Sequence, residues 1–169
     1  RNTPVTIHLN RNFKETLHAC AHVPRKSGQG TWIVSAMQTA YQHLHDLGFA
    51  HSIEVWLDQD LVGGLYGVRI GRMFYAESMF TRSHSGSKIA LMALCYLMQS
   101  GGAKLIDCQL SNPHLMTLGA REIRRHEFLR RLDWHTGREF KGGWPGTIPT
   151  PKELAEWYPK EQSLLHHKA

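Results

Sequence analysis

The sequence has few of the features that mark secreted or membrane-spanning proteins. Its 169 residues include only three cysteines, Cys20, Cys95 and Cys108. Such an odd number of widely spaced cysteines favours buried thiols in a reducing compartment over a disulfide framework. No apolar run approaches the ~20 residues of a membrane-spanning helix, and the first residues lack the apolar segment of a signal peptide. With 41% hydrophobic and 20% charged residues, the composition is that of a soluble globular protein.

Metal-binding patterns and acidic residues are also scarce. The sequence has twelve histidines, but none of them belongs to a Cys-x-x-Cys or His-Glu-x-x-His pattern, and His43 and His45 would lie on different faces of a helix. We therefore predict no metal site. The 14 acidic residues are outnumbered by 20 lysines and arginines, which gives a formal net charge of +6. This excess favours nucleic acid or another polyanion as a partner.

The length suits one domain, or one domain followed by a tail. We expect a domain over residues 1–140 and a tail over residues 141–169, where glycine and proline become frequent. The sequence does not begin with methionine, so we expect either a processed chain or one whose preceding part is missing.

The first half of the chain alternates strands and helices. Residues 5–9 are β-branched and alternate in polarity, which predicts a strand. Asn10 is a candidate cap for a helix through Ala21, and a second helix is predicted from about residue 32 to residue 47, with Gly48 ending it. Three strands are then predicted over residues 52–57, 61–68 and 72–79, and the short connections between them indicate an antiparallel meander.

Two local features of this region have functional interest. Gly63 and Gly64 lie within a predicted strand, which suggests a bulge or the close approach of another backbone or a ligand. The stretch from Glu77 to Lys88 leads from a strand through a polar loop into a helix over about residues 87–99. Strand-to-helix turns of this kind point backbone N–H groups at one place and favour anions there. The helix is apolar nearly all round, so we expect it to be buried.

Beyond this helix a short strand is predicted over residues 104–109. A strand reached through a crossover helix should be parallel to its neighbour, and Asp107 and Gln109 should share one of its faces. A turn or short helix is predicted from Asn112, and a last major helix over residues 121–134. Its inward residues should be Ile123, Phe128, Leu129 and Leu132. A short helix over residues 152–158 is predicted in the tail.

Several blocks of sequence are distinctive in their order and spacing. They are Gly30-Thr-Trp-Ile33, His51-Ser-Ile-Glu-Val-Trp56, Leu61-Val-Gly-Gly-Leu-Tyr-Gly67, Glu77-Ser-Met-Phe80, Ser87-Lys88, Leu105-Ile-Asp-Cys-Gln109 and Leu118-Gly-Ala120. Together they resemble the leucyl/phenylalanyl-tRNA–protein transferase family over about residues 5–132. The resemblance implies an α/β (α+β) fold of the acetyltransferase-like (GNAT) type, with a mixed, mostly antiparallel sheet flanked by helices, and it makes residues 1–140 the catalytic domain.

The resemblance also implies an activity. Members of this family transfer leucine or phenylalanine from an aminoacyl-tRNA to proteins with an N-terminal arginine or lysine, which marks those proteins for degradation by the N-end rule. Methionine stays open as a third donor. No cofactor or metal, no membrane association, a cytoplasmic location and a monomer are expected. The sequence departs from the family in three respects: the small N-terminal domain is absent, the similarity ends at about Leu132, and Leu94 stands where relatives can carry an aromatic residue.

Three residues are the candidate catalytic groups, because the resemblance identifies Glu77, Asp107 and Gln109 with the functional trio of the family. The reaction is the aminolysis of an ester, which needs an oriented amine and polar groups near the developing negative charge. We expect Asp107 to orient Gln109, Gln109 to contact the amine or the reacting carbonyl, and Glu77 to hold an amine or a cationic acceptor side chain. From the sequence alone, both carboxylates could equally be loop caps or solvated strand ends.

The other candidate site residues form two groups. An apolar donor requires an apolar pocket, and Trp32 is also suited to stack on an adenine; the predicted substrate-binding residues are Trp32, Leu65, Phe74, Met79, Leu91, Leu94 and Asn112. Most of them could instead be ordinary core, and Asn112 a turn residue. Phosphates of tRNA would be bound by basic side chains; the predicted residues are Arg82, Lys88, Arg121, Arg124, Arg125, Arg130 and Arg131.

Two other functions stay open. An acetyl-CoA-dependent N-acetyltransferase would share the fold, but residues 82–87 read Arg-Ser-His-Ser-Gly-Ser, with serine at the first glycine position of the pyrophosphate loop typical of those enzymes. A non-catalytic tRNA-binding or adaptor domain is the other alternative. The missing N-terminal domain favours it, whereas the presence of Glu77, Asp107 and Gln109 disfavours it.

Overall fold

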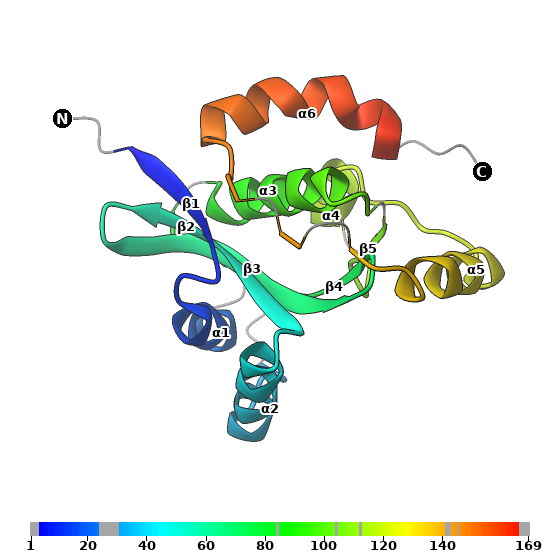
Figure 1. Ribbon diagram of the computed structural model, residues 1–169. Helices are drawn as coiled ribbons and strands as arrows, with labels where there is room; N and C mark the ends of the chain where they lie inside the picture. The colour runs from blue at the N-terminus through cyan, green and yellow to red at the C-terminus, as the bar shows by residue number, and fades with distance from the viewer. Residues whose placement is uncertain are drawn as a thin grey trace.

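A mixed five-stranded sheet forms the centre of the molecule (Figure 1). The structure, a computed structural model, describes residues 4–23, 31–83, 85–103, 105–111, 113–140, 143–144 and 146–165. Its strands, in spatial as well as chain order, are β1 (Val5–Leu9), β2 (Ala50–Leu57), β3 (Asp60–Ile70), β4 (Met73–Thr81) and β5 (Leu105–Asp107). The first four are antiparallel and β5 runs parallel to β4. The predicted meander, the parallel last strand and the α/β class are confirmed.

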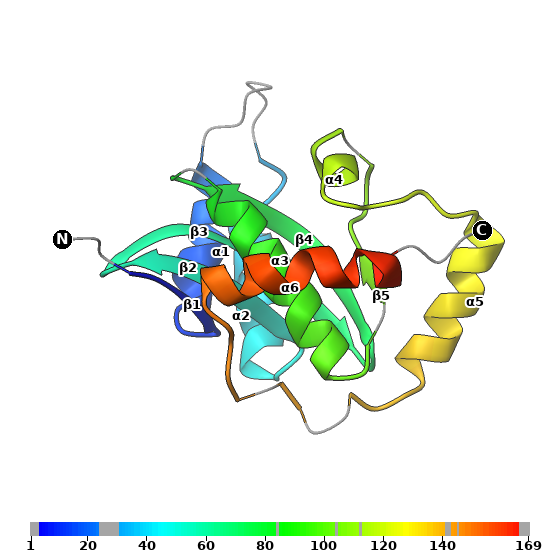
Figure 2. The ribbon, with the colours of Figure 1, turned by 90° about the horizontal axis from the view of Figure 1, so that it is seen from above.

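Helices cover both faces of this sheet. They are α1 (Phe13–His22), α2 (Ser35–Asp46), α3 (Gly86–Ser100), α4 (Pro113–Thr117), α5 (Arg125–Thr136) and α6 (Pro151–Leu165). Figures 1 and 2 show α1 and α2 on one face, α3 on the other with α6 crossing over it, and α4 and α5 beyond the β5 edge. Among the described helices, none is both long enough and apolar enough to span a membrane.

Several helix boundaries differ from the prediction. The cap of α1 is Asn12 rather than Asn10, because the Asn12 side chain accepts a hydrogen bond from the Glu15 N–H while Asn10 adopts a positive φ of 58°. The next helix begins at Ser35, three residues later than expected. The start of α5 lies at Arg125, so Ile123 precedes it. Ile123 and Leu129 were predicted to face the core, but they are 39% and 45% exposed, so this prediction is wrong.

The central helix α3 is buried, as its apolar sequence predicted. Its residues Ala90, Leu94 and Leu97 have no exposed surface, because the sheet packs on one side of the helix and α6 lies across the other (Figure 2). Leu154 of α6 is equally buried and joins the same core cluster. The described part of the tail therefore contributes side chains to the main hydrophobic core.

A contact between two glycines fixes the start of α3 against the sheet. A Cβ atom built on Gly63 of β3 would lie 2.5 Å from the Cα atom of Gly86, the first residue of α3. The two backbones can approach this closely only because neither residue has a side chain. The predicted close approach at Gly63 is thus confirmed, and the partner is another backbone segment.

Replacing Gly63 with alanine should destabilise the fold. The added methyl group meets backbone atoms, which cannot rotate away, so the cost should be about 1–3 kcal/mol or more in free energy of unfolding. Denaturant titration would measure the loss. Gly146→Ala is a matched control, because nothing lies within 4 Å of its added Cβ; equal stability of the two variants would contradict this account of the contact.

A cluster of aromatic and basic side chains ties the segment before α6 to the sheet. The Arg69 guanidinium of β3 lies 4.7 Å from the ring centroid of Phe140 and 5.3 Å from that of Trp144. The Trp144 indole N–H donates to Nε2 of His51 on β2 over 3.4 Å, and the Asn10 amide lies 3.0 Å from Nδ1 of the same ring. Burial, together with the nearby Arg69 charge and His45, lowers the pKa of His51 to about 4.

Stability should fall in acid because of His51. The pKa of His51 is about 4 in the folded protein and near 6.5 in the unfolded chain. Because the unfolded chain binds the proton more readily, the stabilising contribution of this histidine is fully present only above pH 6.5. This contribution is lost as the pH falls towards 4, at a cost on the order of 3 kcal/mol. Denaturant titrations between pH 7 and pH 4 would detect it. His51→Gln should flatten the profile, whereas His114→Gln on the exposed surface should leave it as steep as in the wild type.

Candidate active site

Glu77 occupies a bulge in strand β4. Along β3, Tyr66 pairs with Ser78 but the next residue, Gly67, pairs with Ala76. Glu77 is therefore the extra residue in β4, without a partner of its own on β3. Bulges of this kind redirect a side chain and recur beside active sites. Here the bulge turns a half-buried carboxylate towards the side of the sheet covered by α2, where it meets Tyr41.

Tyr41 of α2 is hydrogen-bonded to the Glu77 carboxylate. Burial raises the pKa of Glu77, the negative charge of Asp107 raises it further, and the hydrogen bond from Tyr41 opposes both effects. Tyr41 is itself buried and packs edge-on against Trp32 and Tyr66, with ring centroids 6.3 and 5.0 Å apart. The sequence did not indicate this contact, because the partner of Tyr41 comes from a strand far along the chain.

Asp107 lies where β5 ends. The two parallel strands pair over only three positions, the last of which joins Tyr75 to Asp107. One Asp107 carboxylate oxygen accepts a hydrogen bond from the backbone N–H of Gln109 over 2.8 Å. Gln109 has a φ of 66° and is exposed. The prediction that Asp107 and Gln109 share a strand face is wrong, because the strand stops at Asp107 and the chain turns at Gln109.

A cleft of about 680 Å³ opens beside this turn. Among the sequence-predicted residues it is lined by Leu91, Asp107 and Gln109, together with Arg121, Arg125 and Arg131. Helix α6 contributes Trp157 and Tyr158 to the wall, and the Tyr158 hydroxyl donates to the Leu118 carbonyl over 2.8 Å. The sequence did not indicate these two aromatic residues, since nothing in the tail shows against which element it packs.

The predicted apolar pocket is largely core in this structure. Leu65, Phe74 and Leu94 are at most 1% exposed and belong to the main hydrophobic cluster. They pack as core residues, which is the alternative that the sequence left open. Met79 is partly buried against the same cluster. Trp32, which precedes α2, is 44% exposed. Asn112 lies outside the described residues.

The basic residues predicted to bind tRNA form two groups rather than one track. Arg82 and Lys88 lie at the start of α3, whereas the arginines of residues 121–131 lie on or just before α5; Figures 1 and 2 show α3 in the middle of the molecule and α5 at one side. Arg130 and Arg131 both pair with Glu127, the latter over 2.5 Å. Their charge is thus partly neutralised, while Arg121 and Arg125 line the cleft.

Neither metal ligands nor a disulfide are found among the described residues. No group of three or more His, Cys, Asp or Glu side chains in that part of the chain is placed to hold a metal ion. All three cysteines are free. Cys95 and Cys108 lie on the cleft wall, and burial raises the pKa of Cys95 to about 12, so this thiol stays protonated at neutral pH and is a poor nucleophile.

The sequence is similar to those of known proteins. A family model described as leucyl/phenylalanyl-tRNA protein transferase matches residues 1–133. The chain belongs to this family. The transferase of Syntrophobacter fumaroxidans is 50% identical over 132 residues, which cover 78% of this chain and 56% of the relative. That of Nitrosospira multiformis is 52% identical over 126 residues, covering 75% and 54%. The chain thus spans about half the length of these members.

The family assignment agrees with the fold. An aminoglycoside acetyltransferase, meta-AAC0020, from an uncultured soil metagenomic sample superposes with a TM-score of 0.54 at 14% sequence identity. The alignment covers 72% of this chain and 93% of that structure. At this identity the likeness concerns the fold alone, and it confirms the acetyltransferase-like architecture that the family resemblance implied.

Two substitutions should move the pKa of Glu77 in opposite directions. Tyr41→Phe removes a hydrogen bond to the charged carboxylate and should raise this pKa, whereas Asp107→Asn removes a neighbouring negative charge and should lower it. Titration of the side-chain carboxyl carbon by NMR would measure both shifts. A shift in the same direction for both variants would contradict the arrangement of the three groups.

Proposed function

We propose that this chain is the catalytic part of a leucyl/phenylalanyl-tRNA–protein transferase. It transfers leucine or phenylalanine, with methionine as a third donor, from aminoacyl-tRNA to proteins with an N-terminal arginine or lysine, and the new N-terminus marks them for degradation by the N-end rule. The observation that supports this most is the pair of carboxylates from neighbouring strands: Glu77 in a bulge and Asp107 at a strand end, in a member of this family.

The reaction needs no redox or metal step. The neutral α-amine of the acceptor attacks the carbonyl carbon of the aminoacyl ester. A C–N bond forms, the C–O bond to the ribose breaks, and a proton of the amine ends on the departing ribose oxygen. Because the ester is already activated, holding the two reactants in line supplies much of the acceleration. The side chains therefore need mainly to orient the amine and to stabilise the developing oxyanion.

Asp107 and Gln109 suit the orienting role. The carboxylate of Asp107 accepts the backbone N–H of Gln109, which fixes a turn that exposes the Gln109 side chain to solvent. An amide carries both donors and an acceptor. It can therefore accept a hydrogen bond from the attacking amine or donate one to the reacting carbonyl oxygen. Asp107 acts in this scheme as the residue that orients Gln109.

Glu77 suits the recognition of a cation. Burial raises the pKa of Glu77, and the negative charge of Asp107 on the neighbouring strand raises it further, so the two negative charges disfavour each other. A bound ammonium or guanidinium group would offset this unfavourable pairing. An acceptor that begins with arginine or lysine brings both an α-amine and a cationic side chain, which matches this requirement.

The remaining assignments follow from the same proposal. Trp32, exposed beside Tyr41, would stack on the terminal adenine of the tRNA, and the basic groups at the start of α3 and around α5 would contact its phosphates. We further propose a cytoplasmic location, a monomeric state, and residues 1–140 as the catalytic domain.

An acetyl-CoA-dependent reaction is the alternative on this fold. Ser85, at the first glycine position of the corresponding loop, has a φ of 68°, the left-handed conformation that glycine adopts readily. The serine thus keeps the turn but adds a side chain where a pyrophosphate would approach the backbone. This argues for tRNA rather than coenzyme A as the donor.

The deciding experiment is transfer of labelled leucine and phenylalanine from charged tRNA to a peptide beginning with arginine. A peptide of the same sequence beginning with aspartate is the control, and acetyl-CoA is tested in parallel. Transfer to the arginine peptide alone is expected. Acetylation in place of aminoacyl transfer would overturn the proposal.

Asp107→Asn should lower transfer by about 100-fold or more. The substitution weakens the hydrogen bond that fixes Gln109 while removing few packing contacts, so the melting temperature should change little. Gln109→Ala should give a comparable loss, whereas Asp133→Asn, an exposed residue on α5, should have none. If Asp107→Asn transferred amino acids at the wild-type rate, Asp107 would have no part in the mechanism.

A further inference from the structure

A second, smaller pocket lies away from the cleft. It has a volume of about 420 Å³ and lies between the end of α1 and the end of β4. Among the described residues it is lined by His18, His22, Val23, Thr81 and Arg82. It shares no lining residue with the cleft that contains Asp107 and Gln109. Three of its five side chains are basic and none is acidic.

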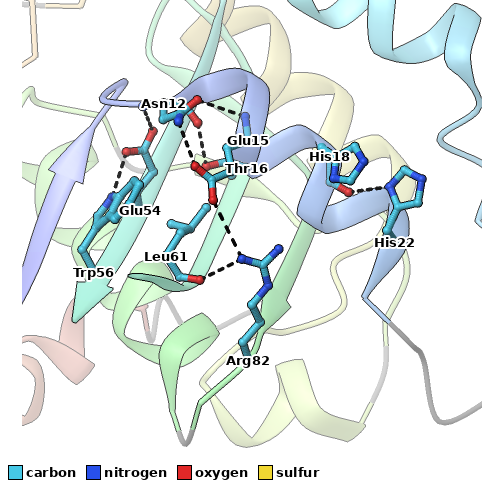
Figure 3. A network of polar contacts seen from close by, with 9 residues as sticks. All are labelled: Asn12, Glu15, Thr16, His18, His22, Glu54, Trp56, Leu61 and Arg82. Carbon is cyan, nitrogen blue, oxygen red and sulfur yellow. Dashed lines mark hydrogen bonds and ion pairs between the residues drawn. The ribbon is translucent and has the colours of Figure 1, made fainter. Parts of the chain in front are cut away.

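The Arg82 guanidinium is held in place at this pocket. Its Nη1 donates to the Leu61 carbonyl over 3.1 Å and lies 3.9 Å from a carboxylate oxygen of Glu15 (Figure 3). The guanidinium also lies 5.5 Å from the Phe80 ring centroid. The side chain is nevertheless 45% exposed. A cation fixed from behind but open to solvent loses little conformational freedom when it binds an anion.

Two histidines of α1 form the other side. His18 and His22 are one helical turn apart, and their rings stack with centroids 3.9 Å apart and planes 19° apart (Figure 3). Nδ1 of His22 lies 2.8 Å from the His18 carbonyl oxygen. Because a carbonyl only accepts hydrogen bonds, Nδ1 must carry the proton. The Nε2 atom of His22 can then donate to a ligand only when the ring is protonated and positive.

We propose that His18, His22 and Arg82 bind a phosphate group of the RNA backbone. Two positive rings in a stack would repel one another, and an anion at their edge offsets that repulsion. A phosphate has enough acceptor oxygens to bind three separate side chains at once. That this RNA is the tRNA donor rests on the proposed function. The binding of a phosphate group is argued from the three side chains alone and does not depend on that function.

A metal ion suits this pocket less well. Histidines at i and i+4 can ligate a metal together, but among the described residues no group of three or more His, Cys, Asp or Glu side chains is placed to hold one here. The fixed Arg82 cation also faces the same space and would repel a second cation. The charged groups in contact with the pocket are thus Arg82 from the end of β4 and, behind it, Glu15 from α1.

The test compares RNA binding by three proteins: the wild type, His18→Gln/His22→Gln, and the control His43→Gln, which changes an exposed histidine of α2. Affinity for uncharged tRNA is measured against salt at pH 6 and pH 8. The double variant should bind about 3–10-fold more weakly at pH 6, with a salt slope smaller by about 0.7–0.9 for each lost contact. The control should bind as tightly as the wild type under both conditions. Unchanged affinity and slope in the double variant would overturn the proposal.

Inorganic phosphate distinguishes a backbone site from a site for the free ion. The ring signals of His18 and His22 are followed by NMR while phosphate, and separately a short RNA, is added. RNA should shift both signals at lower concentration than phosphate does. Saturation by phosphate alone, with no response to RNA, would overturn the assignment to an RNA backbone.

The transfer assay separates this inference from the proposed function. If RNA binding depends on the two histidines but the protein transfers no amino acid, the phosphate site is supported and the proposed transferase activity is refuted. If the wild type transfers amino acids and the histidine substitutions leave RNA binding unchanged, only the proposed phosphate site is refuted.

Discussion

The short parallel pairing of β4 with β5 is the constraint on which the rest of this site depends. Only three residue pairs join the strands, and the pairing ends at Tyr75 and Asp107. Beyond that point β4 bulges at Glu77 while the chain after β5 turns away at Gln109. Two carboxylates thus lie on neighbouring strands, at the end of the pairing and beyond it, and the cleft opens beside the turn, lined by Asp107 and Gln109. Helix α3, which connects the two strands, is held in register by the contact of Gly63 with Gly86.

Much of the fold was predictable because local patterns and tertiary packing agree. The meander, the buried helix and the parallel strand follow from alternation, from an all-round apolar segment and from the geometry of a crossover. The starts of helices were less predictable, because more than one neighbouring residue could cap or begin a helix. Asn10 and Asn12 are both plausible caps, and only the second reaches the Glu15 N–H. The start of α5 was predicted too early, because the apolar Ile123 suggested a helical stripe that the structure does not form.

The candidate site was predictable in its identities but not in its environment. The sequence named Glu77, Asp107 and Gln109, because short blocks around them are distinctive. It could not reveal that Tyr41 bonds Glu77 or that Trp157 lines the cleft, since both contacts join elements far apart in the chain. It also could not separate pocket wall from core: Leu65, Phe74 and Leu94 have the same chemistry in either role, and only packing decides between them.

The packing of α6 on α3 has a consequence for how this protein can be divided. The matched family model ends at residue 133, yet Leu154 is fully buried and Trp144 lies against Arg69 and His51. A fragment cut at the end of the similarity would leave the outer surface of α3 as an uncovered apolar stripe, a feature that promotes aggregation. The end of the matched family model and the end of the folded core are therefore different places in this chain.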